Sequence, residues 1–272
     1  MNRITDKFKE LKTANQGGFI PFIVAGDPDL PTTKKLILEL ARQGASVVEL
    51  GVSFSDPVAD GVTIQASAER ALRRNVNVGE ILQLVAEIRR ENCQVPIILF
   101  SYYNPILQFG LVKFAEKASE AGVDGVLITD LVPEEAEEFR TILVAKDLAL
   151  IMLAAPTSSD ERLRKICEKA SGFVYAVSRA GVTGARDALS SEAENLVARL
   201  RKYTDLPVAV GFGISTAAQV AETWKYADAA VVGSAIVSEI IKLAPDPDLV
   251  SANFVEKIGQ FVNNLLPDEQ DL

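Results

Sequence analysis

The sequence contains no histidine among its 272 residues. This absence excludes His-ligated metal sites, Ser-His-Asp triads and imidazole general bases. Acid–base chemistry near neutral pH must therefore use carboxylates, Lys, Tyr or Cys. Cysteine is almost as scarce, because only Cys93 and Cys167 occur and they lie far apart along the chain. Two isolated thiols favour a reducing compartment over a disulfide-linked scaffold.

Long apolar runs are also missing. No stretch approaches the roughly 18 uncharged apolar residues that a membrane span needs, and residues 1–12 contain no apolar signal-peptide core. The chain has 28 Lys and Arg against 37 Asp and Glu, which gives a net charge of −9. Such an acidic balance argues against nucleic acid or an anionic membrane as the main partner. We therefore expect a cytoplasmic protein.

Short apolar segments alternate with longer amphipathic segments along the whole chain. The short segments are typical of parallel strands that are buried on both faces, and the longer ones of helices. We predict strands at residues 19–24, 47–50, 96–100, 125–128, 149–153, 173–177, 207–210 and 229–232. We predict intervening helices at residues 32–43, 78–90, 111–121, 134–145, 160–170, 192–203 and 216–224, and extra helices at 5–15, 63–74, 235–243 and 249–265.

Eight strands with intervening helices predict an α/β protein of the (β/α)8 TIM-barrel class, with extra N-terminal and loop helices. A doubly wound open sheet with a similar number of strands is the alternative. No linker rich in Pro, Gly or Ser divides the chain. We therefore predict a single domain over residues 1–272, with a frayed polar tail at 267–272.

A carboxylate interrupts the second predicted strand. Alternation along the strand places Val47, Glu49 and Gly51 on one face, so Glu49 is surrounded by apolar residues near a strand end. Burial without a counter-charge raises the pKa of a carboxyl group, which suits a proton shuttle. A structural Glu paired with an Arg or Lys from another strand is the alternative.

The loop after this strand carries two further acids, Asp56 before Pro57 and Asp60 before Gly61. Both are common turn-forming pairs, and a turn is the alternative to a functional role. In a barrel, however, catalytic groups lie at the carboxyl ends of strands and on the loops that follow. Glu49 and Asp60 belong to one such end, so they can share a pocket and divide acid and base duties.

Glycine-rich segments follow the last three predicted strands, at residues 178–185, 211–215 and 233–235. Barrels often bind phosphate with the loops after strands seven and eight and the N-terminus of a short extra helix. Glycine lets the backbone approach a ligand closely, and free N–H groups there can receive an anion. Plain turns are the alternative. The candidate phosphate-binding residues are Gly184, Gly213, Gly233 and Ser234.

Several motifs together resemble the tryptophan synthase alpha chain family. The longest is VELGVSFSDPVADGVTIQ at residues 48–65. The others are FIPF at 19–22, YYNP at 102–105, SRAGVTG at 178–184, GFGIS at 211–215 and GSA at 233–235. The resemblance spans nearly the whole chain, and the long motif is highly specific.

The resemblance implies a (β/α)8 barrel that cleaves indole-3-glycerol phosphate to indole and glyceraldehyde 3-phosphate. It implies no metal and no organic cofactor in this chain. The implied partner is a beta chain that carries pyridoxal phosphate, in an α2β2 complex. In the family, the residues that match Glu49 and Asp60 are catalytic, the loop that holds Asp56 faces the beta chain, and the loop around Thr183 closes over the substrate.

The implied reaction also needs an apolar slot for the indole ring. Its candidate walls are Phe22, Ile64, Phe100, Leu127 and Phe212, for each of which plain barrel core is the alternative. Tyr175 is expected to orient Glu49 or the substrate, and Arg179 and Thr183 lie on a loop suited to act as a lid. No Lys stands out at a strand end, which disfavours a Schiff-base mechanism.

Three other interpretations remain open from the sequence. A different phosphosugar enzyme, such as an isomerase, can use the same scaffold. A stand-alone indole-releasing lyase would share every catalytic residue. A non-catalytic phosphate-binding barrel would keep the glycine-rich loops, although the presence of both Glu49 and Asp60 argues against it.

Overall fold

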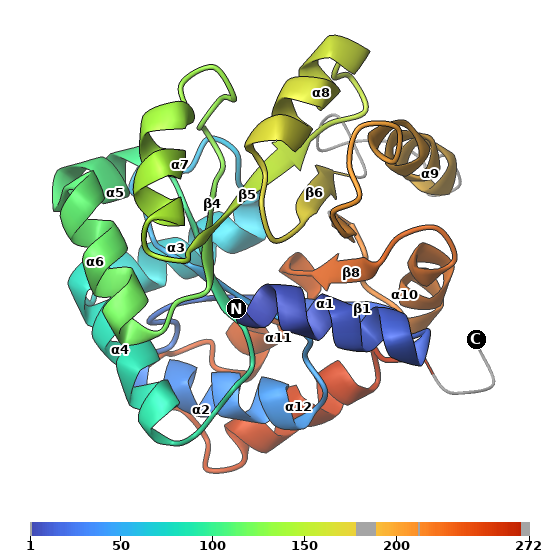
Figure 1. Cartoon of the computed structure of the whole chain (residues 1–272). Coiled ribbons are helices and arrows are strands. Elements are labelled where there is room, and N and C mark those ends of the chain that lie inside the picture. The colour runs from blue at the N-terminus through green and yellow to red at the C-terminus, as the bar shows by residue number, and fades with distance from the viewer. Residues whose placement is uncertain (1, 178–188, 212, 268–272) are drawn as a thin grey trace.

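Eight parallel strands close into a barrel in the order β1 to β8, with β1 pairing to β8 (Figure 1). The computed structural model describes residues 2–177, 189–211 and 213–267. The closed barrel confirms the TIM-barrel prediction and excludes the open sheet. The strands are β1 (Gly18–Val24), β2 (Val48–Gly51), β3 (Ile97–Ser101), β4 (Gly125–Ile128), β5 (Ala149–Ala154), β6 (Val174–Val177), β7 (Val208–Gly211) and β8 (Ala229–Val232).

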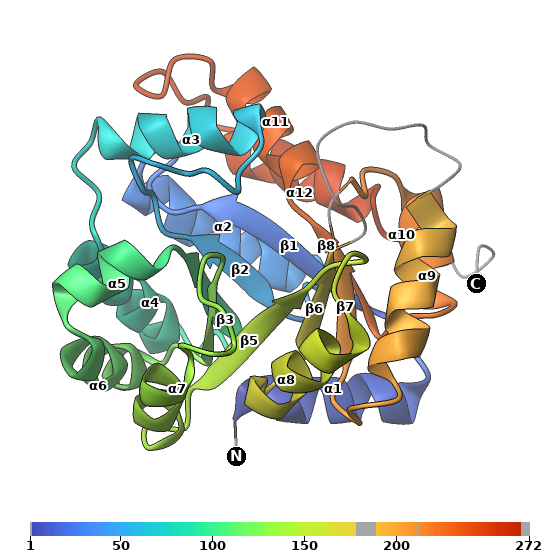
Figure 2. The same cartoon turned by 90° about the horizontal axis from the view of Figure 1, so that it is seen from above.

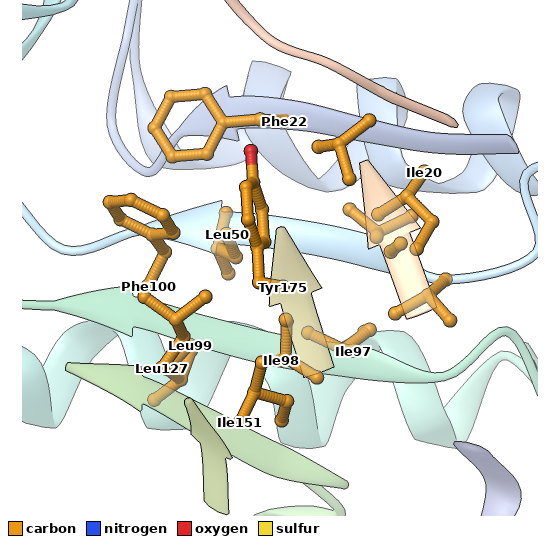
Figure 3. Close-up of a cluster of buried hydrophobic side chains, with 14 of the residues drawn as sticks. Ile20, Phe22, Leu50, Ile97, Ile98, Leu99, Phe100, Leu127, Ile151 and Tyr175 are labelled. Atoms are coloured by element: carbon orange, nitrogen blue, oxygen red, sulfur yellow. The ribbon is translucent and has the colours of Figure 1, made fainter. Parts of the chain in front are cut away.

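The strand register places interior side chains in layers. Gly51, Phe100, Leu127 and Ile151 are successive partners on β2 to β5. Parallel partners at one register point to the same face, so these residues share a layer of the barrel interior. Apolar side chains fill this space, as Figure 3 shows. The described part of the barrel interior is therefore a packed core.

Helices surround the barrel (Figures 1 and 2). Side-chain caps start several of them: Asp29 accepts from the Thr32 N–H at α2, and Asn77 forms a capping box with Glu80 at α4. The helices are α1 (Arg3–Ala14), α2 (Leu30–Arg42), α3 (Val62–Leu72), α4 (Val78–Arg90), α5 (Tyr103–Phe109), α6 (Leu111–Ala121), α7 (Glu137–Val144), α8 (Asp160–Lys169), α9 (Leu189–Leu200), α10 (Ala217–Trp224), α11 (Ser234–Leu243) and α12 (Phe254–Asn263).

Helix α1 covers the amino end of the barrel. It buries Ile4, Phe8 and Leu11, and the Phe8 ring lies 5.6 Å from the Phe173 ring, centroid to centroid. Phe173 directly precedes β6, so this contact is at the amino ends of the strands. The opposite end is left for the loops that carry the candidate site. In Figure 2, α1 lies at the bottom of the view, and α3 and α11 lie at the top.

Several helices differ from the prediction, among them the helix predicted at residues 192–203, which is α9 at Leu189–Leu200. The helix predicted from residue 134 begins at Glu137, because residues 132–135 form a separate turn in which the Glu135 N–H donates to the Val132 carbonyl. The helix predicted at 249–265 begins only at Phe254. Helix α5 was not predicted, because it has only 7 residues and contains Pro105. The predicted frayed tail lies outside the described residues, apart from Pro267.

No helix in the described part of the chain is long and apolar enough to cross a membrane.

Candidate active site

Glu49 is a buried carboxylate inside the barrel. It lies on β2 opposite Phe22 of β1 and Ile98 of β3, and it is 1% exposed. Its Oε1 atom has no hydrogen-bond partner, and no Lys or Arg among the described residues pairs with it. Burial raises the pKa of Glu49 from 4.5 to about 8. Within the described residues, the alternative of a structural ion pair therefore has no support.

Tyr175 faces Glu49 from β6. Burial, and to a smaller extent the negative charge of Glu49, raises the pKa of Tyr175 well above its usual value. The Tyr175 hydroxyl also lies over Gly211 of β7, where an added Cβ would be only 2.0 Å from the hydroxyl oxygen. Figure 3 shows this hydroxyl pointing toward Phe22. Tyr175 is thus in position to influence Glu49, while its ring occupies the barrel interior.

A pocket opens above this layer, at the carboxyl ends of β1, β2 and β3. Four of the predicted site residues line it together: Phe22, Asp60, Ile64 and Phe100. The rings of Phe22 and Phe100 meet edge to face at 5.2 Å. The remaining lining residues are Val24, Gly51, Val52, Ser53, Phe54, Ala68 and Tyr102. The walls are mostly aromatic and aliphatic, which suits a flat apolar ring.

Glu49 lies one layer beneath this pocket. Its strand neighbour Phe22, and Gly51 two residues further along β2, both contribute to the lining. Gly51 has no side chain, and a Cβ there would lie 2.8 Å from the Phe22 ring. The glycine therefore lets the Phe22 ring lie across the end of β2.

Asp60 is held in the pocket wall by Tyr102. The Tyr102 hydroxyl donates to Asp60 Oδ2 at 3.1 Å and accepts from the Ala59 N–H at 2.9 Å. Burial raises the pKa of Asp60, and the hydrogen bond from Tyr102 opposes that rise. The two acids therefore have different environments. No hydrogen bond or charge opposes the effect of burial on the pKa of Glu49, whereas Asp60 accepts a hydrogen bond that favours its ionised form.

Two predicted substrate-binding residues lie elsewhere in the barrel. Leu127 on β4 and Tyr175 on β6 are buried in the interior and do not contribute to the pocket lining. Leu127 is the strand partner of Phe100, so it lies next to a residue of the pocket wall. Their proposed contacts with substrate remain predictions.

The candidate phosphate-binding residues follow β7 and β8. Gly213 has φ +86°, which favours glycine, and its α-carbon faces open space. Gly233 precedes α11, and a Cβ there would lie 3.4 Å from Phe22 Cβ, so it adjoins the apolar pocket. Ser234 begins α11 and is exposed. Its N-cap residue, Gly233, has no side chain to bond the first N–H groups, so these groups can receive an anion.

Four candidates lie outside the described residues: Arg179, Thr183, Gly184 and Phe212. The predicted lid is therefore not tested by the structure. Asp56 is described, and it lies on the exposed loop between β2 and α3, where Ser55 donates to its carboxylate at 2.6 Å.

Tyr102 was not among the predicted site residues, although it belongs to the YYNP motif. Its hydroxyl reaches across from the end of β3 to the loop after β2, and no local spacing indicates such a contact. Phe54 was also missed, and its ring packs on Tyr102 with centroids 5.3 Å apart. The only available signal was the presence of two adjacent tyrosines directly after a predicted strand.

The sequence profile of the family described as tryptophan synthase alpha chain matches residues 8–265. The chain belongs to this family. A tryptophan synthase alpha chain from Geobacter sulfurreducens is 49% identical over 97% of this chain and 100% of its own length. One from Caulobacter sp. strain K31 is 48% identical over 94% of this chain and 92% of its own length. Members of the family are lyases that act in tryptophan biosynthesis.

Solved structures of the same family have the same fold. Tryptophan synthase subunit alpha from Legionella pneumophila superposes with a TM-score of 0.88 at 35% identity, covering 97% of each chain. A chain from the tryptophan synthase α2β2 complex of Pyrococcus furiosus gives a TM-score of 0.83 at 40% identity, covering 92% of this chain and 97% of its own.

Among the residues that the structure describes, no group of three or more Cys, Asp or Glu side chains is arranged to hold a metal ion.

Proposed function

We propose that this chain cleaves indole-3-glycerol phosphate to indole and glyceraldehyde 3-phosphate, with Glu49 and Asp60 as its catalytic residues. Family membership supports the reaction. The observation that carries the residue assignment is the burial of Glu49, which raises its pKa to about 8. A carboxylic acid that is still protonated at neutral pH can donate a proton, which an ordinary Glu cannot do efficiently.

The reaction is a retro-aldol cleavage. The Glu49 carboxyl donates its proton to indole C3, which forms an indolenine cation. The resulting Glu49 carboxylate then takes the proton of the side-chain hydroxyl next to C3. The bond between C3 and that carbon breaks, its electron pair restores the aromatic indole, and the hydroxyl carbon becomes the aldehyde of glyceraldehyde 3-phosphate. Glu49 is protonated again at the end of the cycle.

Asp60 stabilises the cation formed by protonation at C3. Its carboxylate accepts the indole N1–H and offsets the positive charge that develops on the ring. This role requires the ionised form, which the hydrogen bond from Tyr102 favours. The apolar walls formed by Phe22, Ile64 and Phe100 receive the ring itself.

The phosphate end of the substrate is assigned to the loops after β7 and β8. Gly213, Gly233 and Ser234 offer backbone N–H groups and one hydroxyl there, and Gly233 adjoins Phe22 in the apolar pocket. We include Gly184 in this group, and Leu127, Tyr175, Thr183 and Phe212 among the substrate contacts. Since protons move only between the substrate and a carboxyl group, the proposed mechanism requires no metal and no organic cofactor in this chain.

We further propose a tryptophan synthase beta chain as partner, with pyridoxal phosphate held by that chain. The relative from Pyrococcus furiosus belongs to an α2β2 complex, and we propose the same assembly for this chain. Support from this chain comes from the loop between β2 and α3, where Val58 is 87% exposed and Asp56 is also exposed, and from the first residue of α3, Val62, which is 81% exposed. Large apolar side chains at such exposure are typical of a surface that a partner covers.

A cytoplasmic location fits a chain whose two cysteines are both buried and free.

An indole-release assay tests the proposal. Purified chain is incubated with indole-3-glycerol phosphate, with and without beta chain, and released indole is measured. We expect turnover that increases when the beta chain is added. Equal turnover in both conditions would favour a stand-alone lyase, and no turnover in either would favour a non-catalytic barrel. In an active preparation, near-normal turnover by Glu49→Gln would remove Glu49 from the mechanism.

A further inference from the structure

A second buried carboxylate lies beside the pocket and takes no part in the proposed chemistry. Asp27 follows β1 by three residues and is 1% exposed. It accepts a hydrogen bond from the Ser67 hydroxyl through Oδ2. Its Oδ1 forms an ion pair with Arg70 Nε at 2.8 Å, without the geometry of a hydrogen bond. Ser67 and Arg70 are both on α3. One carboxylate thus joins the loop after β1 to a helix more than thirty residues further along the chain.

The loop that carries Asp27 is itself fixed. The Gly26 N–H donates to Thr33 Oγ1 at 3.0 Å, which ties the loop to the start of α2. Gly26 has φ +88°, and a Cβ there would lie 2.5 Å from Val76 Cγ2. The backbone therefore requires glycine and packs directly on Val76. Asp27 is presented from a rigid support, so its bonds constrain α3 rather than the loop.

Helix α3 forms one side of the pocket, and β1 forms the side next to it. Ile64 and Ala68 of α3 line the pocket, as do Phe22 and Val24 of β1. Ser67 directly precedes Ala68, and Asp27 comes three residues after Val24. The Asp27 contacts therefore set the separation of two pocket walls. They also fix the helix that begins directly after Asp60 and Gly61.

Arg70 extends this connection to α11. Its Nη2 atom donates to the Ala244 carbonyl at 2.6 Å, at the C-terminal end of α11. Helices α3 and α11 pack side by side, as Figure 2 shows. The N-terminus of α11 is the candidate phosphate site, so the same ion pair links the apolar wall to the helix proposed to bind phosphate.

We propose that Asp27 is a positioning residue for this site: through Ser67 and Arg70 it fixes α3 against the end of β1, and so sets the width of the apolar slot. The assignment of this slot to indole rests on the proposed function. A purely stabilising role is the competing explanation. An apolar pair of similar size can be as stable as a buried ion pair, but it cannot accept the Ser67 hydrogen bond that joins α3 to the loop after β1.

The test distinguishes a positioning role from a purely stabilising role by replacing both members of the Asp27–Arg70 ion pair. Asp27→Leu/Arg70→Met removes both charges, so neither is left buried and unpaired, and Asp27→Asn removes only the carboxylate charge. The matched controls are Asp124→Leu/Arg89→Met and Asp124→Asn. The control pair is equally buried, with Asp124 2% and Arg89 11% exposed against 1% and 12% for Asp27 and Arg70. Asp124 precedes β4, at the amino end of the barrel away from the pocket.

Two readouts are measured well below the melting temperature of each variant. The first is kcat and KM for indole-3-glycerol phosphate, and the second is the Kd of indole by calorimetry, which needs no turnover. We expect both Asp27 variants to raise KM and the indole Kd about ten-fold, the scale of a poorly fitted methylene in an apolar pocket. We expect kcat to change less than KM, because Glu49 lies on β2 and is not displaced. Both Asp124 variants should leave KM and Kd unchanged.

Wild-type KM and indole affinity in the Asp27→Leu/Arg70→Met protein would overturn the positioning role, even if its melting temperature changed. So would an equal loss in the Asp124 controls, or an absence of indole binding by the wild-type pocket. A failure of the proposed reaction gives a different result, because the wild-type chain would then release no indole from indole-3-glycerol phosphate. The indole titration would still show whether the Asp27 variants bind indole more weakly than the wild-type chain.

Discussion

The hydroxyl of Tyr102 holds the carboxylate of Asp60 from the neighbouring strand. It donates to Asp60 Oδ2 at 3.1 Å and accepts from the Ala59 N–H at 2.9 Å. One side chain at the end of β3 thereby fixes both the backbone and the acidic group of the loop after β2. The direction of donation favours the ionised form of Asp60, which is the form that the proposed mechanism uses.

Tyr102→Phe should therefore lower activity without disrupting the pocket. Removal of one hydrogen bond to a charged group costs about 1.5 to 3 kcal/mol, so we expect kcat/KM to fall at least about ten-fold. The pKa of Asp60 should rise further, because burial is then unopposed. The acidic limb of the pH–rate profile should consequently move to higher pH. Tyr103→Phe is the control, since Tyr103 does not line the pocket. An unchanged acidic limb would contradict this role.

Sequence periodicity was sufficient for the strands but not for contacts between loops. The apolar runs at residues 125–128 and 229–232 gave both ends of β4 and β8, because strands buried on both faces are apolar without interruption. A polar residue inside such a run is therefore conspicuous, and Glu49 was identified in this way. Its burial and the resulting rise in its pKa were anticipated for the same reason.

The contacts of Tyr102 and Asp27 could not be predicted from the sequence. Each bonds to residues that are about forty positions away, and these positions meet only when the barrel closes. Asp27 lies between Gly26 and Pro28 and has the local pattern of a turn. Helix boundaries failed for a related reason: Pro133 and the two glutamates after it suggest a helix start, but Glu134 instead pairs with Arg162 and Lys165 of α8.

Glu49→Gln should abolish indole release and should also change how stability depends on pH. The folded-state pKa of about 8 lies above the ordinary 4.5 of an unfolded chain. The stability contribution of the protonated group is therefore complete below about pH 4.5 and is lost as the pH rises to about 8. Gln does not titrate. The stability of the variant relative to wild type should thus increase by about 1.4 kcal/mol per pH unit across that window, in total on the order of 5 kcal/mol.

Urea unfolding of both proteins between pH 4 and pH 9 measures this difference. Because the two chains share every other titrating group, those contributions cancel in the difference. A flat difference across the window would show that Glu49 ionises normally in the folded chain. It would also remove the physical basis for its role as the proton donor.

Ser234→Ala tests the phosphate end of the site separately from the indole end. The Ser234 hydroxyl lies at the exposed start of α11, a helix without a side-chain cap. Loss of one hydrogen bond to a charged group is worth about 1.5 to 3 kcal/mol, so KM for indole-3-glycerol phosphate should rise about ten-fold or more. The Kd of indole, which has no phosphate, should not change. Ser238→Ala, one turn further along the exposed side of α11, is the control and should alter neither value.

Val58→Lys and Val62→Lys test the proposed partner surface. Both side chains are more than four-fifths exposed on the loop and helix start that follow β2. Full burial of a Val contributes about 1.5 to 3 kcal/mol, so each Lys should raise the Kd for the beta chain at least about ten-fold. Val144→Lys is the control, because Val144 is also exposed but lies at the end of α7. Since neither valine lines the pocket, indole affinity should be unchanged in all three proteins. Equal beta-chain affinity for the Val62 and Val144 variants would place the partner on another surface.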